Sequence, residues 1–344
     1  MNDGPLIIRG IDEVVAAVPY LLGVHPQDSV VVFPTDPATS PLARIDMPTT
    51  EAEREEVAEE LASVYRVRAT PVVLLAYTDR RDLAEAACTR IGPALESRSD
   101  VIAAVAVDGD RWTRLDRPEN GTVTQSSKDL FAAEAVYRGD ATPYESAAQH
   151  SASFEPVANP VSEELMTAAA AACSTLEDLA VERAWIGLTI DRYVATGTPL
   201  GDQAAARLIS DVQHLDLRDH AWASIDRKNS PQHAELWKDL LVRAPAGTQA
   251  PPASLAAFSF WICGDSMSAR AALERVPAGQ PYRLANLIST VLRAGIDPRI
   301  APIPLELPEQ IRTAPVASSE GARHDRNEPP HPNTGPQRPG ISRG

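Results

Sequence analysis

The chain has 344 residues, 44% of them hydrophobic, and its formal net charge at pH 7 is -15. This length and composition predict a protein that buries a sizeable core and holds two domains. The acidic balance argues against a general nucleic-acid binder and against an anionic membrane surface, because both select for clustered Lys and Arg. We therefore expect neither a nucleic-acid nor a membrane partner.

The three cysteines, Cys88, Cys173 and Cys263, lie far apart and form neither a CxxC motif nor a Cys/His spacing. That pattern is typical of a reduced, intracellular protein and not of a disulfide framework or a zinc site. The first ten residues lack a basic segment followed by an apolar one, so no signal peptide is expected. No apolar run approaches the length of a membrane span. The sequence therefore predicts a cytoplasmic protein.

Residues 11–33 form the stretch around which the first half is organised. A short apolar helix is expected to end at Gly23 in a left-handed conformation, and the polar turn from His25 to Asp28 follows it. The next strand, VVVF after Ser29, has no polar face and must be covered on both sides. It belongs in the middle of a sheet.

The rest of the first half alternates strands and helices. Residues 42–47 read as an edge strand, and Thr50 can cap an acidic helix behind it. The other expected elements are strands at 71–77, 101–107 and 111–115, a helix over 79–96 interrupted at Gly92-Pro93, and a helix around 128–137. Two buried strands joined by a helix indicate a parallel pair, and Asp108-Gly109 indicates a hairpin turn. Residues 1–150 therefore predict a mixed α/β sheet domain with five strands.

The second half shows only helical periodicity. Residues 151–160 read as a linker, residues 161–300 as an all-α domain, and residues 301–344 as a disordered Pro-rich tail. Helices are expected over 162–195, 202–213, 216–225, 231–242, 252–263, 267–276 and 282–294. The segment GDSMSARAALERVP, from Gly264, is typical of a tetratricopeptide-like hairpin, and Gly201-Asp202 repeats its start. An ordinary helical hairpin with a Gly turn explains the same residues.

Four segments together resemble an actinobacterial family known only as domain of unknown function 4192. They are PYLLGVHPQDSVVV, ARIDMP, the Arg218-Asp219 pair in LDLRDHAW, and the long stretch FWICGDSMSARAALERVPAGQPYRLANLISTVLRAGIDP. The resemblance covers most of residues 6–300. Family members often carry cysteines after the tryptophan strand, whereas here Trp112 is followed by TRLDRPENG. The resemblance implies a cytoplasmic actinobacterial protein and supplies no activity.

His25, Asp28 and Ser29 supply the three residue types of a nucleophilic triad, which invites a hydrolase interpretation. Residues this close along one turn rarely reach triad geometry. Asp28 or Ser29 is better explained as an acceptor for backbone N–H groups of the turn. Ser29 also lacks the G-x-S-x-G context of a nucleophile elbow.

Asp79 follows one buried strand, and Asp108 and Asp110 follow the next. If the two strands are parallel neighbours, these carboxylates cluster at the edge where open α/β sheets bind ligands, and they could hold Mg²⁺. The alternative is that Asp79 caps a helix while Asp108 makes the hairpin turn, and we favour this local explanation.

Two Arg/Asp pairs complete the candidate residues: Arg44 with Asp46 on a strand face, and Arg218 with Asp219 on a helix. Either pair is explained by an ion pair of small energetic weight. The chain contains no Gly-rich phosphate loop and no paired His residues, so no cofactor and no metal ligand are assigned.

The function favoured by these patterns is a non-catalytic protein-interaction or regulatory module with a protein partner. Helical hairpins, an acidic surface and the absence of a strong catalytic motif support it. The alternative is a metal-dependent hydrolase or nucleotide-processing enzyme that uses the carboxylates at the strand ends.

Overall fold

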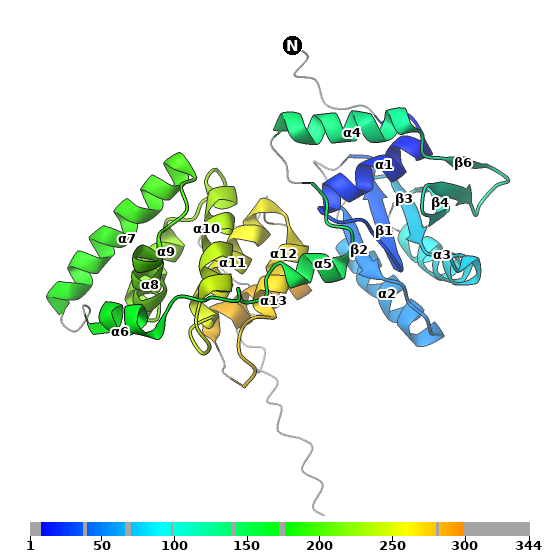
Figure 1. Cartoon of the computed structure of the whole chain (residues 1–344). Coiled ribbons are helices and arrows are strands. Elements are labelled where there is room, and N and C mark those ends of the chain that lie inside the picture. The colour runs from blue at the N-terminus through cyan, green and yellow to red at the C-terminus, as the bar shows by residue number, and fades with distance from the viewer. Residues whose placement is uncertain are drawn as a thin grey trace, which may run out of the picture. The chain divides into compact units, whose positions relative to one another are not determined.

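A computed structural model describes residues 8–298 except 37–39, 66–69, 98, 139–141, 172–175, 280–281 and 297. The predicted tail, residues 301–344, lies outside the described residues. Two regions are distinguished below by their secondary structure: the sheet region, residues 8–138, and the helical region, residues 147–298 (Figure 1). Both belong to one compact unit, residues 1–304, so the domain boundary at 151–160 stays a prediction.

The sheet region contains six strands in the order β2-β1-β3-β4-β5-β6. They are β1 Ser29–Pro34, β2 Ala43–Asp46, β3 Val72–Tyr77, β4 Val101–Asp108, β5 Arg111–Arg114 and β6 Asn120–Thr122. β3 and β4 are parallel and every other pair is antiparallel, which confirms the mixed sheet and the edge position of β2. β6 was not predicted because its three residues, NGT, carry no strand pattern.

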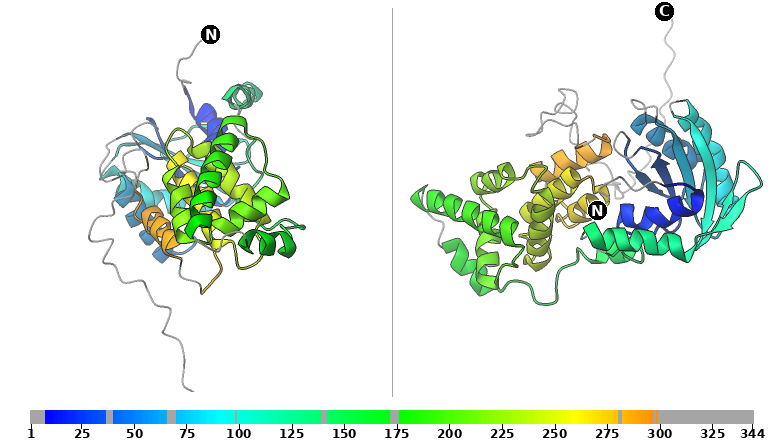
Figure 2. Two further views of the ribbon diagram at one scale, coloured as in Figure 1. Left: turned by 90° about the vertical axis from the view of Figure 1, so that its left-hand side faces the viewer. Right: turned by 90° about the horizontal axis from the view of Figure 1, so that it is seen from above.

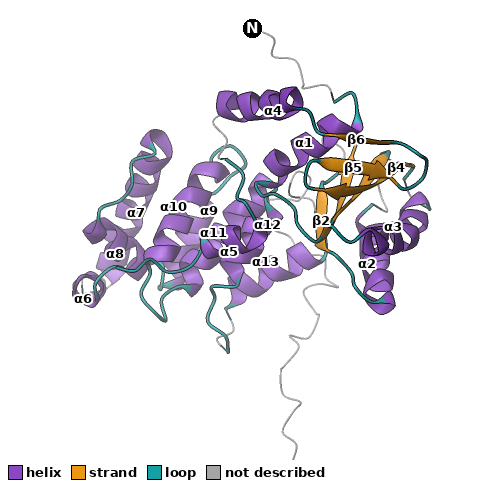
Figure 3. Ribbon diagram, turned by 45° about the vertical axis from the view of Figure 1, so that its right-hand side comes forward, coloured by secondary structure: helices purple, strands orange, loops and turns teal. Residues whose placement is uncertain are grey.

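Helices cover both faces of the sheet. Helix α1 (Ile11–Leu22) and helix α4 (Gln125–Arg138) contribute to a core with Val31 and Phe33. Helices α2 (Glu51–Val64) and α3 (Arg81–Glu96) pack on the other face, against Val30 and Val32. Figures 2 and 3 show the two helix pairs and the strands between them. Successive side chains of β1 thus enter two different cores, which is why the strand is apolar throughout.

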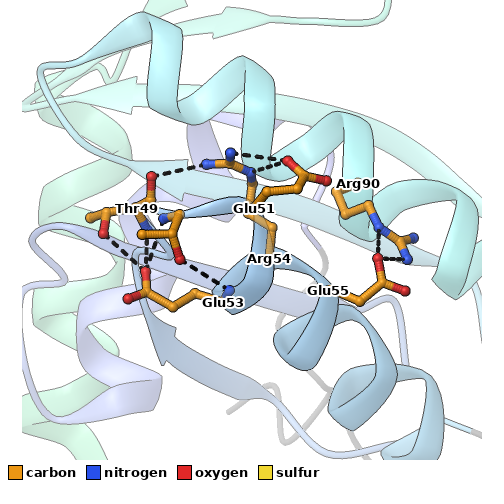
Figure 4. A network of polar contacts seen from close by, with 7 residues as sticks. Thr49, Glu51, Glu53, Arg54, Glu55 and Arg90 are labelled. Atoms are coloured by element: carbon orange, nitrogen blue, oxygen red, sulfur yellow. Dashed lines mark hydrogen bonds and ion pairs between the residues drawn. The ribbon is translucent and has the colours of Figure 1, made fainter.

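The helix that follows β2 begins as the sequence predicts. The Thr50 hydroxyl accepts the Glu53 N–H (3.2 Å), and the Glu53 carboxylate accepts the Thr50 N–H (3.0 Å), which makes a capping box (Figure 4). The backbone N–H groups of Thr50 and Thr49 both donate to the Glu53 carboxylate and lower its pKa. At the same helix, Glu55 accepts a hydrogen bond from Arg90 of α3, which joins the two helices of this layer.

Helix α3 differs from its prediction in two respects. It begins at Arg81, two residues later than expected, and it continues through Gly92-Pro93 to Glu96. Pro93 removes one backbone donor and its ring crowds the carbonyl of Thr89, yet only three residues of the helix follow it, so the disturbance is confined to the last turn. Its N-cap is Arg80 without a side-chain bond, so the expectation that Asp79 caps the helix is wrong.

The helical region contains nine helices within its described residues. They are α5 Ala147–Ala152, α6 Glu163–Ala171, α7 Leu176–Thr196, α8 Asp202–Asp211, α9 Leu215–Ala223, α10 Ser230–Arg243, α11 Ala250–Cys263, α12 Ser266–Leu273 and α13 Arg283–Arg293. The stretch predicted as helical over 162–195 is described as α6 and α7, with residues 172–175 outside the description. None of the described helices is both long and apolar enough to span a bilayer.

The two Gly-Asp pairs that precede helices, Gly264-Asp265 and Gly201-Asp202, differ in the backbone conformation of the glycine. Gly264 ends α11 in the left-handed region (φ 86°), and Asp265 caps α12 by accepting the Ser268 N–H at 2.9 Å. Gly201, before α8, is extended (φ -65°, ψ 161°) and makes no such turn. The local repeat is therefore not reproduced, and the tetratricopeptide-like character stays a prediction.

Candidate functional site: a cavity at the sheet edge

The strand directions bring three distant segments to one edge of the sheet. β1 runs antiparallel to β3 and pairs Ser29 with Tyr77, while β3 runs parallel to β4 and pairs Tyr77 with Val107. The start of β1 therefore lies beside the carboxyl ends of β3 and β4. The turn before β1 and the residues after β3 and β4 must converge there.

A cavity of about 560 Å³ lies at this edge, which we call the sheet-edge cavity. One wall is apolar and comes mainly from α1, and the other walls come from the turn and the strand ends. The lining residues are Val15, Ala16, Pro19, Tyr20, His25, Pro26, Gln27, Asp28, Tyr77, Thr78, Asp79, Val107, Asp108, Gly109, Asp110, Val123, Lys128 and Glu145.

The turn is held by contacts from outside it. Tyr144 donates its N–H to the Gly23 carbonyl (2.9 Å), and its own carbonyl accepts the His25 N–H (2.8 Å). The Gln27 side chain donates to the Glu145 carbonyl at 3.2 Å. Gly23 has φ 71°, the left-handed conformation expected at the end of α1. The cavity rim therefore depends on a segment more than a hundred residues later in the chain.

Asp28 has an unusual backbone for a residue with a β-carbon. Its φ is 38°, and within the described chain it is the only non-glycine residue with positive φ. Its carboxylate accepts the Thr78 hydroxyl at 2.9 Å, and its carbonyl accepts the Met47 N–H at 2.8 Å. The expectation of a bond to the backbone of the turn is thus replaced by bonds to Thr78, the residue after β3, and to Met47, the residue after β2. Positive φ costs little for Asp compared with bulkier residues.

Tyr77 lies at the end of β3 and lines the cavity. The residue is 6% exposed, and its hydroxyl has no hydrogen-bond partner among the described residues. Burial raises the pKa of this phenol, so the hydroxyl keeps its proton. A buried hydroxyl without a partner is costly, and in native structures it calls for a specific explanation.

Asp110 is held by a cation at the mouth of the cavity. Its carboxylate accepts a hydrogen bond from Lys128 of α4 at 2.6 Å. Asp108 and Arg111 close the hairpin between β4 and β5, with Gly109 at φ 57°, as the turn prediction requires. Asp108 and Asp79 are exposed. The turn role of Asp108 and its place in the cavity are compatible.

Five of the ten residues singled out from the sequence therefore come together in one cavity: His25, Asp28, Asp79, Asp108 and Asp110. The sequence analysis missed Tyr77, Thr78 and Lys128. The sequence pattern marks Tyr77 only as the last residue of a buried strand. Its position directly before Thr78-Asp79, at a strand's carboxyl end, is the signal that identifies it.

The remaining candidates lie outside the cavity lining. Ser29 is fully buried and its hydroxyl has no partner among the described residues, so it forms no hydrogen bond with His25 and the triad interpretation loses its nucleophile. Arg44 and Asp46 pair with each other on β2 at 2.9 Å. Arg218 and Asp219 pair on α9, and Arg218 also donates to the Tyr282 hydroxyl at 3.0 Å.

Within the described residues, no three His, Cys, Asp or Glu side chains are arranged to hold a metal ion. Cys88 and Cys263 are free thiols, and burial raises the pKa of Cys88 to about 12. Neither cysteine lines the cavity. We therefore derive no metal-dependent or thiolate step at this site.

A second group of ionisable side chains lies inside the helical region. Glu182 of α7 is 3% exposed and accepts two hydrogen bonds from Arg207 of α8, at 2.7 and 2.9 Å. Asp211, 1% exposed, has no hydrogen-bond partner for either oxygen among the described residues. Its burial, and then the negative charge of Glu182, raise the pKa of Asp211 to about 8. We call these three residues the buried acid cluster.

The comparisons with known proteins identify one family. The family model described as "Domain of unknown function (DUF4192)" matches residues 12–299. This match spans both the sheet-edge cavity and the buried acid cluster. No curated protein and no solved structure matches the chain.

Proposed function

Because the chain belongs to the family of domain of unknown function DUF4192, whose description assigns no activity, we propose its function from geometry: the sheet region binds a small organic molecule in the sheet-edge cavity. The protein then acts as a ligand-binding regulatory module. The observation that carries the proposal is the convergence of the turn before β1 and the ends of β3 and β4 on one cavity of about 560 Å³.

Two further features support this proposal. A volume of about 560 Å³ falls within the range of small-molecule sites, roughly 300–1,000 Å³. The lining combines an apolar wall from α1 with polar and charged side chains, and polar groups of this kind fix the orientation of a ligand in small-molecule sites. Open α/β sheets also bind ligands outside the carboxyl ends of their strands.

A thermal-shift panel of metabolites against the full chain tests the proposal, because specific binding to the folded state raises the melting temperature by mass action. A ligand found in this way should lose its shift in Asp79→Arg, which places a cation on the cavity rim. Asp46→Arg is the matched control, since Asp46 is also an exposed aspartate but lies on β2 outside the cavity. A shift that persists in Asp79→Arg, or a panel without any shift, contradicts the proposal.

The hydrolase or nucleotide-processing alternative requires a divalent ion on the carboxylates at the strand ends. The described residues contain no group of three such ligands, which gives this alternative less support. Adding Mg²⁺ and Mn²⁺ to the same panel tests it. A shift with either ion that depends on Asp108 would restore it.

A second function, protein docking by the helical region, is favoured by one feature of α7. Val181 and Leu188 are 61% and 72% exposed and lie seven residues apart, so they share one face of the helix. Crosslinking in the native host should recover a partner with the wild-type chain and lose it with the double variant Val181→Glu/Leu188→Glu. Val136→Glu, an equally exposed position on α4, is the control. Recovery that is unchanged in the double variant argues against docking there.

We further propose a cytoplasmic location, on the basis of the three widely spaced cysteines, and no nucleic-acid partner, on the basis of the net charge of -15.

A further inference from the structure

One segment of the chain contacts both the rim of the sheet-edge cavity and the helical region. It runs from Tyr144 to Glu155, and we call it the linking segment. At its start, the backbone of Tyr144 bonds to Gly23 and His25 at 2.9 and 2.8 Å. At its end, the Glu155 carboxylate accepts a hydrogen bond from Arg275, which follows α12, at 2.8 Å. The contacts that hold the middle of this segment on the helices therefore also support the rim.

His150 of α5 is the buried centre of the linking segment. The residue is 4% exposed, and its Nε2 lies 2.9 Å from the Ser268 hydroxyl of α12. Its ring packs edge-on against the Tyr144 ring, with the ring centres 5.2 Å apart, and lies 5.4 Å from the Phe154 ring. Phe154 in turn packs on Phe260 of α11. One imidazole therefore joins α5 to α12 and also contacts the tyrosine that bonds to the rim.

The other ring nitrogen of His150, Nδ1, is buried and has no hydrogen-bond partner among the described residues. A neutral imidazole carries a proton on one nitrogen, whereas the imidazolium carries one on each. A protonated ring would therefore keep a buried N–H group without an acceptor, which is costly.

The titratable groups around this ring do not compensate for that cost. They are the Tyr144 phenol, the Asp265 carboxylate that begins α12, and the Lys238 ammonium of α10, which donates to the Tyr144 hydroxyl at 3.4 Å. Asp265 favours a charged ring, but its carboxylate already accepts the Ser268 N–H at 2.9 Å. Burial, the largest cause, and then the charge of Lys238 outweigh Asp265 and lower the pKa of His150 from its ordinary 6.5.

Release of the linking segment from the helices changes the protonation of His150. Outside its site the ring regains the ordinary pKa of 6.5, so below that pH the released form binds more protons than the seated form. The contribution of the neutral ring to seating is therefore full above about pH 6.5 and is lost as the pH falls below it. Because Tyr144 belongs to the same segment, its bonds to the turn before β1 weaken with it.

We infer that the linking segment is a pH-sensitive latch: a neutral His150 holds it on α10, α11 and α12, and proton uptake by His150 releases it together with the Tyr144 bonds at the rim of the sheet-edge cavity. Acidification thus opens one side of the cavity. This inference goes beyond the proposed function, because the latch operates with or without a ligand.

Hydrogen exchange of the full chain at pH 7.5 and pH 5.5, corrected for the intrinsic exchange rates, tests the latch. The reporters are the amides of His25 and Tyr144, because both donate the backbone bonds that the latch closes. Their protection should fall by about three- to tenfold at the lower pH. Tenfold is the limit, because a group with a pKa of 6.5 that takes up its proton only in the released form shifts the opening equilibrium by about that factor over this range.

Two variants without a titratable ring assign the effect to His150. His150→Gln keeps a polar group for Ser268, and His150→Phe keeps the ring packing. A variant that still protects the Tyr144 amide at pH 7.5 should lose the fall between the two pH values. His25→Gln is the control, because it removes the exposed imidazole at the rim and should leave the fall at the Tyr144 amide unchanged.

A titration of the wild-type chain keeps the test decisive where both variants unseat the segment. The His150 imidazole is followed by NMR of the chain labelled with ¹³C-histidine, and the spectrum of His150→Phe assigns its signal. The latch requires that protection falls over the same pH range in which this imidazole takes up its proton. Midpoints that differ by more than about one pH unit overturn it.

Three further outcomes contradict the latch. They are equal protection of the wild-type chain at both pH values, an unchanged fall in a variant of His150 that stays protected at pH 7.5, and loss of the fall in His25→Gln. The latch and the proposed function fail separately. Unchanged protection overturns the latch and leaves the ligand site, whereas a metabolite panel without any shift contradicts the ligand site and leaves the latch.

Discussion

Acidic side chains are placed in opposite ways in the two regions of the molecule. In the sheet region, Asp79 and Asp108 stand exposed at the ends of neighbouring strands, where they outnumber nearby cations. In the helical region, Glu182 and Asp211 are buried between helices, where one is paired with Arg207 and the other holds its proton. The comparison teaches that a carboxylate inside the fold must be paired or protonated, whereas the carboxylates at the cavity are exposed and can stay charged.

The largest effect should come from removing the cation of the buried acid cluster. Arg207→Ala leaves Glu182 buried without its partner and also removes the packing of Arg207 on the Trp185 ring, 4.1 Å from the ring centre. We expect a loss of about 3 kcal/mol in the free energy of unfolding, measured by urea denaturation. Arg183→Ala, at an exposed position on the same helix as Glu182, is the control. If Arg207→Ala and Arg183→Ala lower the free energy of unfolding by equally small amounts, the buried carboxylate does not depend on its cation and the contrast between the two regions is wrong.

The second prediction uses pH. The pKa of Asp211 is about 8 in the folded chain and 3.8 ordinarily, so the folded state keeps a proton that the unfolded state has released. The contribution of this group to stability is therefore full below about pH 4 and is lost as the pH rises toward 8. Asp211→Asn removes this loss.

The stability advantage of Asp211→Asn over the wild type should thus grow by about 3 kcal/mol between pH 5 and pH 7, close to 1.36 kcal/mol for each pH unit. Urea denaturation at both pH values measures it. Asp216→Asn, at an exposed position on α9, should show no such growth. A constant difference at all pH values would mean that Asp211 is ionised in the folded chain.

The third prediction concerns the turn. Asp28→Ala removes the bond from the Thr78 hydroxyl and should lower the free energy of unfolding by about 1 kcal/mol. Asp28→Gly loses the same bond but relaxes the backbone at φ 38°, so its cost should be smaller. Differential scanning calorimetry distinguishes the two variants. If the glycine variant is the less stable one, the extra conformational freedom of glycine in the unfolded chain outweighs the relief of backbone strain at this position.

The smallest effect should come from an exposed ion pair. Glu55 and Arg90 join α2 and α3 at the surface, where the bond to Arg90 lowers the pKa of Glu55 (Figure 4). Arg90→Ala should leave the melting temperature almost unchanged, because solvent screens such pairs. A large drop in melting temperature would show that exposure alone does not separate the two kinds of acidic residue.

The main strands of the sheet could be predicted because each one is marked by the residues within it and not by contacts with distant segments. β1, β3 and β4 are apolar runs that water cannot solvate, and Thr50 and Gly23 mark helix ends by their own chemistry. β6 was not predictable, because Asn120, Gly121 and Thr122 form a strand only beside β5. There a β-carbon on Gly121 would lie 2.5 Å from the Trp112 ring.

The sequence predicted which acidic residues lie at the candidate site, but it did not predict that the turn before β1 joins them to form a cavity. Asp79, Asp108 and Asp110 were correctly placed at strand ends, because parallel strands end at one edge. The sequence could not show that the turn of Asp28 meets them, since that depends on the antiparallel pairing of β1 with β3. Nor could it show that Tyr77 lacks a partner or that Asp211 lies near Glu182, because both follow from packing between distant segments.

The two backbone bonds between Tyr144 and the segment Gly23–His25 have a consequence for the order of folding. The partners are about 120 residues apart, so the contact closes a long loop and forms later than the local hairpins and helices. A chain still emerging from the ribosome can pair its first strands before the rim of the cavity exists. The rim of the cavity is therefore completed only once residue 144 has been synthesised and has returned to the first turn.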